Sequence, residues 1–337
     1  MQAYLYEALA NNKVKCNLCR HRCLIKVGDR GICSVRENAG GILQTLVYGK
    51  LIARHIDPIE KKPLFHFLPG TLSYSIATVG CNLRCQFCQN ADIAQMPADH
   101  SGMIMGDTCS PANVVAAAVR GGCQSISYTY TEPTVFFEFA YETAKLASDQ
   151  GLRNVFVTNG YMTAEALEMI NPYLDAANVD LKAFSDKYYK ELCGARLKHV
   201  QATLQLMKTL GIFVEVTTLI VPGLNDNPAE LKSLAAFIAQ DLGVDTPWHI
   251  SRFHPTYKLT DSPPTPVKTL ITAREIGLKA GLRYVYTGNV PGNAAENSFC
   301  YRCGEMLIER RGFQVGKLRV KEGLCAHCGA RMDGVWE

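Results

Sequence analysis

The sequence predicts an α/β fold built on a parallel sheet. Between about Ser73 and Thr287, short apolar runs rich in β-branched residues alternate with longer segments whose apolar residues recur at helical spacing. Such an alternation requires parallel strands joined by helical crossovers. Six β-α units would form a barrel or an open three-quarter barrel, in which functional residues gather at the carboxyl ends of the strands.

The expected strands follow one another at intervals that leave room for a helix between most neighbours. They cover residues 73–79, 125–130, 153–158, 177–182, 212–220, 248–253 and 283–287. The expected helices cover residues 111–120, 133–149, 163–170, 199–210, 227–240 and 267–280. Thr163 and Pro228 suit helix starts, and a glycine follows several of these segments as a helix stop.

The segments on either side of this core differ from it in composition. We divide the chain into an N-terminal cysteine-rich module and connector (1–72), a core barrel (73–289) and a C-terminal zinc-ribbon-like module (290–337). The 337 residues carry a net charge of only +4, which does not indicate a nucleic-acid partner. Apolar runs are too short to span a bilayer and the start lacks a secretory segment, so we expect a cytoplasmic protein without a membrane partner.

Fourteen cysteines in a chain of this kind indicate metal sites rather than disulfides. Most of them fall into three groups. These are an N-terminal quartet (Cys16, Cys19, Cys23, Cys33), a central trio (Cys81, Cys85, Cys88) and a C-terminal quartet (Cys300, Cys303, Cys325, Cys328). Cys109, Cys123 and Cys193 stand alone, and we expect them to be small buried or half-buried residues.

The central trio follows the first expected strand of the core. Three thiolates from one loop can hold three corners of a four-iron, four-sulfur cube, whereas ordinary electron-transfer cubes take four cysteines. The remaining iron is then open to a substrate. A zinc knuckle or a purely structural cluster is the alternative interpretation.

The Cys-x3-Cys-x2-Cys spacing, with Phe87 just before the third cysteine, resembles the radical S-adenosylmethionine (SAM) enzymes. The resemblance implies that SAM chelates the open iron, that Phe87 lies near the adenine and that Glu132, after the second strand, binds the SAM amino group. A carboxylate beside an ammonium group gives a charge-assisted hydrogen bond. The alternative is a glutamate in the first turn of a helix. Tyr130 and Thr131 depart from the glycines of that family.

Further strand ends resemble the pyruvate formate-lyase activating enzymes. They carry a Thr-Asn-Gly turn, an Asp-Leu-Lys segment, a Val-Pro-Gly turn and a Pro-aromatic-His strand in the same order. The resemblance implies that this set of residues contacts SAM: Thr158, Asn159, Asp180, Lys182 and His249. For His249 a buried core histidine is the alternative. Val157 stands where that family has an acidic residue.

Several segments together resemble the radical SAM member of the AmmeMemoRadiSam three-protein system, and the resemblance covers nearly the whole chain. They are CNLCRHRCLIKVGDRGICSVREN near the start, DPIEKKPLFHF, HISRFHPTY, YVYTGNVPG and the cysteine-rich end. The resemblance implies a partial parallel (β/α)6 barrel of TIM type flanked by two cysteine-rich metal-binding modules, together with two partner proteins. The N-terminal quartet suits zinc and an auxiliary iron–sulfur cube equally well, with His21 as a possible substitute ligand. The two Cys-x2-Cys pairs of the C-terminal quartet favour zinc.

The implied activity is that of a radical SAM oxidoreductase. A [4Fe-4S] cluster, reduced by a partner protein, cleaves SAM to methionine and a 5′-deoxyadenosyl radical, which takes a hydrogen atom from a small molecule or a protein. We expect the two metal modules to close the mouth of the barrel. The alternatives are an activating enzyme that places a radical on a glycine of a partner, a non-catalytic zinc scaffold, and RNA modification, against which the weak charge counts.

Overall fold

The computed structural model describes residues 1–290, 292 and 294–337, and its central feature is a sheet of eight strands. Seven of them run parallel: β8 (Leu72–Ala77), β10 (Ser125–Tyr128), β11 (Arg153–Thr158), β12 (Ala176–Asp180), β13 (Phe213–Ile220), β14 (Trp248–Arg252) and β15 (Val285–Gly288). The order is β15-β14-β13-β12-β11-β10-β8-β7. The predicted α/β fold with a mostly parallel sheet is confirmed.

Antiparallel β7 (Ala53–Pro58) forms one edge of this sheet, paired with β8. It comes from the segment expected to be a connector, so the N-terminal region contributes directly to the central sheet. The other edge is β15. Within the described part of the chain these two edge strands do not pair with each other, which leaves the sheet open rather than closed into a complete barrel.

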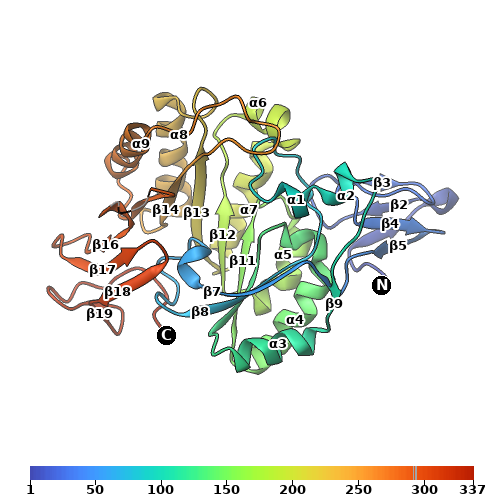
Figure 1. The fold of residues 1–337 in the computed structure, drawn as a ribbon, viewed down its shortest axis with the longest axis horizontal. Coiled ribbons are helices and arrows are strands. Elements are labelled where there is room, and N and C mark those ends of the chain that lie inside the picture. Colours follow the sequence, from blue (N-terminus) through green and yellow to red (C-terminus); the bar gives the residue numbers. More distant parts are fainter. Residues whose placement is uncertain (291, 293) are drawn as a thin grey trace.

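Helices cover the outside of the curved sheet (Figure 1). They are α3 (Pro111–Arg120), α4 (Phe137–Asp149), α5 (Ala164–Ile170), α7 (Leu197–Thr209), α8 (Pro228–Phe237) and α9 (Val267–Lys279). Side chains cap the starts of α3 and α5: the hydroxyl oxygens of Ser110 and Thr163 each accept from a backbone amide three residues on, at 3.2 Å. None of the helices in the described residues is long and apolar enough to cross a membrane.

The loops at the carboxyl ends of the strands contain short helical turns. They are α1 (Ala91–Ala94), α2 (Met96–Asp99), α6 (Asp186–Tyr188) and the 3-10 turn η3 (Pro133–Phe136). The π-helical turn η5 (Tyr189–Cys193) follows α6 in the same loop, whereas a second π-helical turn, η6 (Ile238–Leu242), extends α8 toward the amino end of β14. The helix expected over 133–149 is therefore divided, because η3 precedes α4.

The N-terminal module is a small antiparallel unit that packs beside α4 and α5 (Figure 1). It contains β1 (Tyr6–Ala8), β2 (Val14–Cys16) and β3 (Leu24–Ile25), a hairpin of β4 (Arg36–Ala39) and β5 (Ile42–Thr45), and β6 (Lys50–Leu51), which pairs with β9 (Asp107–Thr108). Arg36 and Glu138 of α4 form an ion pair at 2.7 Å, with side chains 2% and 0% exposed. Removing one partner of such a pair leaves an uncompensated buried charge, so this contact ties the module firmly to the core.

The C-terminal module lies on the other side of the molecule, as Figure 1 shows. It contains β16 (Ser298–Phe299), β17 (Met306–Arg311), β18 (Gln314–Leu318), β19 (Val320–Lys321) and β20 (Leu324–Cys325). Leu307 and Ile308 share a buried cluster with Phe65, Tyr284 and Tyr286. Tyr284 and Tyr286 lie at the start of β15, so this module covers the amino end of the sheet. The expectation that both modules close the mouth of the barrel is thus not met by the C-terminal one.

Candidate cofactor and metal sites

The main candidate site lies at the carboxyl end of the sheet, in the cysteine loop (residues 78–90) that joins β8 to α1 and carries the central trio. Two backbone hydrogen bonds fix this loop against η5. The amide of Arg84 donates to the carbonyl oxygen of Cys193 at 2.8 Å, and the amide of Gln86 donates to the same turn at 3.0 Å. The loop is therefore anchored at two points by its backbone, independently of its thiols.

The Cys81 thiol faces two N–H donors. The amide of Leu83 lies 3.4 Å from its Sγ, and the Asn159 side-chain nitrogen lies 3.6 Å from it. Burial raises the pKa of Cys81 well above its usual range, and the nearby Glu132 carboxylate raises it further. A bound metal would displace this proton and leave a thiolate stabilised by both donors.

Cys85 lies against Cys193, one of the cysteines expected to stand alone. The hydrogen bond from the Cys193 thiol lowers the pKa of Cys85, and the Lys182 ammonium group acts in the same direction. For Cys88, burial and the neighbouring Cys85 raise the pKa to about 11. Sequence spacing gave no indication that Cys193 belongs to this site, because the fold brings it there through the docked turn η5.

Glu132 is the N-cap of η3 and is only 1% exposed. Its Oε1 accepts from the Thr134 amide at 3.0 Å and the Thr158 hydroxyl at 2.8 Å, and its Oε2 accepts from the Asn159 amide at 2.8 Å. All these donors are neutral, and burial raises the pKa of Glu132. A cationic ligand beside Oε2 would stabilise the ionised carboxylate, and that oxygen has room for a further donor.

Asn159 connects this carboxylate to the cysteine loop. Its amide donates to Glu132, while its side-chain nitrogen donates to Asn82 Oδ1 at 2.8 Å and approaches Cys81. The predicted cofactor residues Thr158, Asn159 and Glu132 therefore meet the first cysteine of the trio in one hydrogen-bonded group.

Asp180 and Lys182 follow β12 at the same end of the sheet and form an ion pair at 2.9 Å. Burial opposes the charge on Lys182, but Asp180 and Cys85 outweigh it and hold the pKa of Lys182 above its usual range. The ammonium group lies 6.0 Å from the ring centre of Phe87, which is itself 3% exposed. A positive charge and an aromatic face thus border the cysteine loop.

Tyr130 explains why the sequence can depart from glycine before Glu132. Its φ of +62° lies in the left-handed region that glycine occupies without strain. Three contacts hold it there: its hydroxyl donates to Asp57, the Lys62 ammonium group lies 4.5 Å from its ring centre, and the Asn90 side chain donates to its carbonyl oxygen at 2.8 Å. Two of these residues come from the segment expected to be a connector.

The structure does not bring His249 to this site. It is the second residue of β14, near the amino end of the sheet, and its Nε2 lies 2.6 Å from Glu215 Oε2. Its ring packs against Phe65 and Tyr286, with ring centres at 4.7 Å and 5.2 Å. The expected strand-end position of His249 is therefore wrong, because the strand begins only one residue before it.

His254 occupies the position at the carboxyl end that was expected of His249. It follows the last residue of β14 by two and is exposed. The loop it belongs to contacts the cysteine loop, since the amide of Lys258 donates to the carbonyl oxygen of Gln86 at 3.0 Å. The sequence contains a signal for it, because Phe253-His254 is a second aromatic-His pair beside Trp248-His249.

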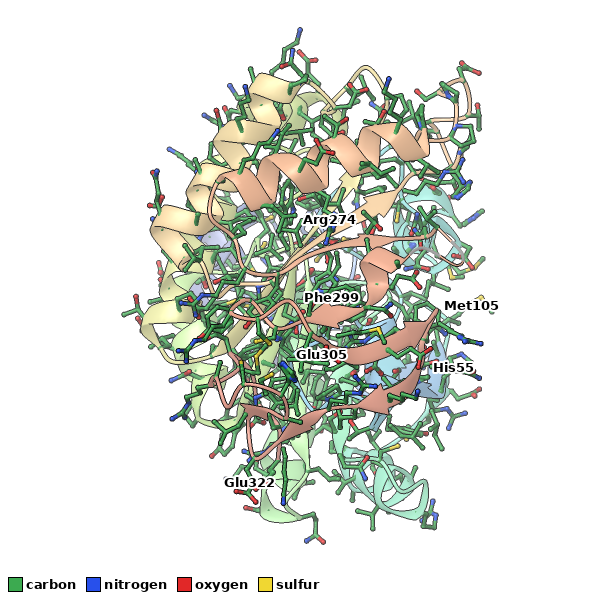
Figure 2. The ribbon with its side chains drawn as sticks, turned by 90° about the vertical axis from the view of Figure 1, so that its left-hand side faces the viewer. His55, Met105, Arg274, Phe299, Glu305 and Glu322 are labelled. Atoms are coloured by element: carbon green, nitrogen blue, oxygen red, sulfur yellow. The ribbon has the colours of Figure 1, made fainter. Side chains whose placement is uncertain are left out.

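The C-terminal quartet is a compact set of thiols. The Sγ atoms of Cys300 and Cys328 are 3.7 Å apart, those of Cys303 and Cys325 are 3.8 Å apart, and all four lie within 4.8 Å of one another. Zinc–sulfur bonds of about 2.3 Å in a tetrahedron place the thiolates about 3.8 Å apart. The quartet therefore suits a metal ion of this size. Figure 2 turns this module toward the viewer and labels Phe299 and Glu305, between which the first cysteine pair lies in the sequence.

The N-terminal quartet lies beside the cysteine loop rather than on the far side of its module. Its members line one cavity together with Asn82 and Thr134. Asn82 follows Cys81 in the chain, and the amide of Thr134 donates to Glu132. His21 is not among the cavity-lining residues, and its Nε2 lies 2.7 Å from the carbonyl oxygen of Asn82. The amide of Arg20 donates to the Tyr161 carbonyl oxygen at 2.9 Å, which docks this part of the module onto the loop after β11.

Comparison with known proteins places these sites in a family context. A family model described as the radical SAM superfamily matches residues 75–238. An uncharacterized protein of Methanocaldococcus jannaschii is 48% identical over 334 residues, which cover 98% of each chain. The pyruvate formate-lyase-activating enzyme of Clostridium pasteurianum is 24% identical over 200 residues, 54% of this chain and 80% of that one.

Among solved structures, SuiB of Streptococcus suis bound to S-adenosylmethionine superposes with a TM-score of 0.52 at 15% identity. The match covers 72% of this chain and 56% of that one. At this identity the likeness concerns the fold. The sequence matches show a radical SAM domain and homology to pyruvate formate-lyase-activating enzymes.

Proposed function

Because the chain belongs to the radical SAM superfamily, a membership that implies a [4Fe-4S] cluster and SAM, we propose that Cys81, Cys85 and Cys88 hold the cluster and that SAM occupies its fourth iron. The observation that carries this proposal is the hydrogen-bonded group around Asn159. It joins a cysteine of the trio to Glu132, a buried carboxylate with only neutral donors.

The residues present fit such a cluster. The cysteine loop supplies three thiols, held by a backbone that is anchored elsewhere, and the donors at Cys81 and Cys85 favour thiolates. When bound, the cluster supplies the electron that cleaves SAM to methionine and a 5′-deoxyadenosyl radical. The protein's own tasks are to orient SAM, to exclude water and to place one C–H bond of the substrate.

Individual residues have separate tasks in this proposal. Glu132 binds the SAM ammonium group through Oε2, and Thr158 and Asn159 fix the orientation of that carboxylate. Phe87 offers an apolar face to the adenine, and Lys182 with Asp180 offers a charged pair to the polar groups of SAM. We assign to His254, rather than His249, the strand-end contact that the family resemblance implies.

The substrate and partners belong to the same proposal. A low-potential donor protein supplies the electron, and the resemblance of the whole chain to the AmmeMemoRadiSam member supports two further partner proteins. The substrate is a small molecule or a protein. Activation of a glycyl-radical enzyme is a second candidate, favoured by the similarity to pyruvate formate-lyase-activating enzymes. At the C-terminal quartet we propose a structural zinc ion, on the sulfur spacing given above.

Anaerobic reconstitution tests the proposal. The protein, loaded with iron and sulfide and treated with a strong reductant, should release methionine and 5′-deoxyadenosine from SAM in equal amounts. Protein that binds only zinc in the central trio, or that leaves SAM intact, would refute it. Deuterium transfer from labelled candidate substrates into 5′-deoxyadenosine would then identify the C–H bond that is broken.

Replacing Glu132 with glutamine should weaken SAM binding about 10- to 100-fold, because one charge-assisted hydrogen bond is lost. The iron content should stay unchanged, since Glu132 is not a ligand. Glu168→Gln, on an exposed face of α5, is the matched control and should bind SAM normally. Equal SAM affinity in Glu132→Gln and the control would remove Glu132 from the site.

The two histidines should separate binding from stability. His254→Ala should weaken SAM binding by about 5- to 30-fold and change the free energy of unfolding by less than about 0.5 kcal/mol, as for other exposed residues. His249→Ala should lower that free energy by about 3 kcal/mol, because Glu215 keeps a buried charge without its partner. Isothermal titration calorimetry would measure the affinity for SAM, and denaturant unfolding would measure the free energy of unfolding. A loss of SAM affinity confined to His249→Ala would reverse the assignment.

A further inference from the structure

The N-terminal quartet is a second group of four thiols, and its surroundings differ from those of the C-terminal quartet. We propose that Cys16, Cys19, Cys23 and Cys33 bind an auxiliary [4Fe-4S] cluster in the cavity between the N-terminal module and the cysteine loop. The site itself stands on its own thiols. The role given to it below rests on the proposed function.

The four thiols converge although they come from separate parts of the module. Cys16 ends β2, Cys19 and Cys23 lie in the turn before β3, and Cys33 precedes β4. All four line one cavity, whose remaining wall is largely apolar: Leu18, Ile25, Ile32 and Val135. Apolar walls of this kind limit water access and suit an iron–sulfur cube.

The spacing of the thiols distinguishes a cube from a zinc ion. In the described residues, no three of the four N-terminal Sγ atoms lie within 4.8 Å of one another, and the same is true of the central trio, whereas the C-terminal quartet meets this limit. A tetrahedral zinc ion needs thiolates about 3.8 Å apart. A cube sits between its thiolates and separates them by roughly 6 Å. The N-terminal quartet therefore lacks the close spacing that a single tetrahedral zinc ion needs, and so does the central trio.

Two side chains that line the same cavity each carry a buried N–H donor with no acceptor among the described residues. The donors are Arg36 Nε and Asn82 Nδ2, on side chains that are 2% and 1% exposed. A buried donor left without a partner costs about 1–3 kcal/mol. The sulfides and thiolates of a cube are anionic acceptors and would satisfy both donors. The charge of Arg36 is already balanced by Glu138, so what its Nε lacks is an acceptor rather than a counter-ion.

Asn82 places this second site next to the first. It follows Cys81 in the chain, its Oδ1 accepts from Asn159, and its Nδ2 belongs to the unpartnered donors of the N-terminal cavity. One side chain thus lies between the two groups of thiols. With four protein thiolates every iron of the auxiliary cube is coordinated, so this cube offers no position to a substrate and can only exchange single electrons.

Metal analysis of anaerobically purified full-length protein tests the inference. We expect about eight iron and eight sulfide ions, two cubes, together with about one zinc ion per chain. In a triple variant with Cys81, Cys85 and Cys88 changed to alanine, about four iron ions should remain. Their reduced electron paramagnetic resonance signal should not change when SAM is added. In Cys16→Ala/Cys19→Ala about four iron ions should likewise remain, but the addition of SAM should change their signal.

The outcomes separate this inference from the proposed function. Wild-type protein with about four iron and two zinc ions per chain would show that the N-terminal quartet binds zinc and would overturn the inference. About four iron ions and one zinc ion, lost together in the triple variant, would also overturn it. If the triple variant keeps its iron and Cys16→Ala/Cys19→Ala contains no iron at all, the result would support the auxiliary site. The same result would contradict the cluster assigned to the central trio. If a variant fails to fold, a wild-type count of about eight iron ions supports the inference and a count of about four overturns the pair of cubes.

Discussion

Replacing Cys85 with alanine should abolish SAM cleavage. The rate of methionine release should fall by at least about three orders of magnitude, because the cofactor and not a side chain does the chemistry. About four iron ions per chain should be lost as well. The loop should keep its fold, since its backbone is held by the hydrogen bonds of Arg84 and Gln86 to η5. High-performance chromatography of methionine and 5′-deoxyadenosine would measure the effect.

Cys109→Ala is the matched control for this experiment. Cys109 is half-buried and belongs to none of the three cysteine groups. Its replacement should leave iron content and methionine release near the wild-type values. Release of methionine by Cys85→Ala at a wild-type rate, or an equal loss in the control, would contradict the assignment of the central trio.

Replacing Cys303 with serine should destabilise the molecule without touching the SAM site. Cys303 is exposed, so its truncation leaves no cavity, and the loss of a zinc ligand is the main effect. Structural zinc contributes on the order of 10 kcal/mol to small cysteine-rich modules at neutral pH. We expect the zinc ion to be lost and the melting temperature to fall by about 10 °C or more, as Phe65, Tyr284 and Tyr286 lose their cover.

His327→Ser provides the control within the same cysteine pair. His327 is exposed, is a possible zinc ligand by type and lies outside the compact quartet. Its replacement should change neither zinc content nor melting temperature. Folded Cys303→Ser at low temperature should still cleave SAM, because the C-terminal module covers the amino end of the sheet. A Cys303→Ser protein with full zinc content and an unchanged melting temperature would contradict the zinc site.

Local sequence patterns predicted much of the core because they depend on neighbours in the chain. The strand over 153–158 and the helix over 111–120 have the expected bounds, and Thr163 caps α5 as expected. The cysteine loop, Glu132 and the Thr158-Asn159 turn meet at one end of the sheet for a simple reason. The carboxyl ends of parallel strands always lie at the same edge.

The parts that were not predicted depend on an assignment by family resemblance and on how surfaces dock. The SAM contact was assigned to His249 by the family resemblance, although the expected strand over 248–253 already made it the second residue, at the amino end of β14. Cys193 reaches Cys85 only through the docking of η5. The C-terminal module packs under β15 because of buried contacts of Phe65 and its neighbours, which have no signature in the spacing of the cysteines.

The two cysteine-rich modules therefore lie at different ends of the same sheet. The N-terminal module adjoins Asn82 of the cysteine loop and Tyr161 of the loop after β11, where the proposed auxiliary cluster would lie beside the SAM site. The C-terminal module closes the amino end around a buried network. In it the amide of His66 donates to Glu215 at 2.7 Å, and Arg310 donates to the Phe65 carbonyl oxygen at 2.8 Å. Catalysis should depend on the first module and thermal stability on the second.

The most direct test of the central claim is whether SAM binds to an iron of the cluster that Cys81, Cys85 and Cys88 are proposed to hold. Electron–nuclear double resonance of the reduced protein, with SAM carrying a nitrogen isotope on its amino group, would measure this. We predict a hyperfine coupling from that nitrogen to the cluster, present in Cys16→Ala/Cys19→Ala and absent when Cys81, Cys85 and Cys88 are alanine. A reduced cluster that shows no coupling to labelled SAM at saturating concentration would contradict the account.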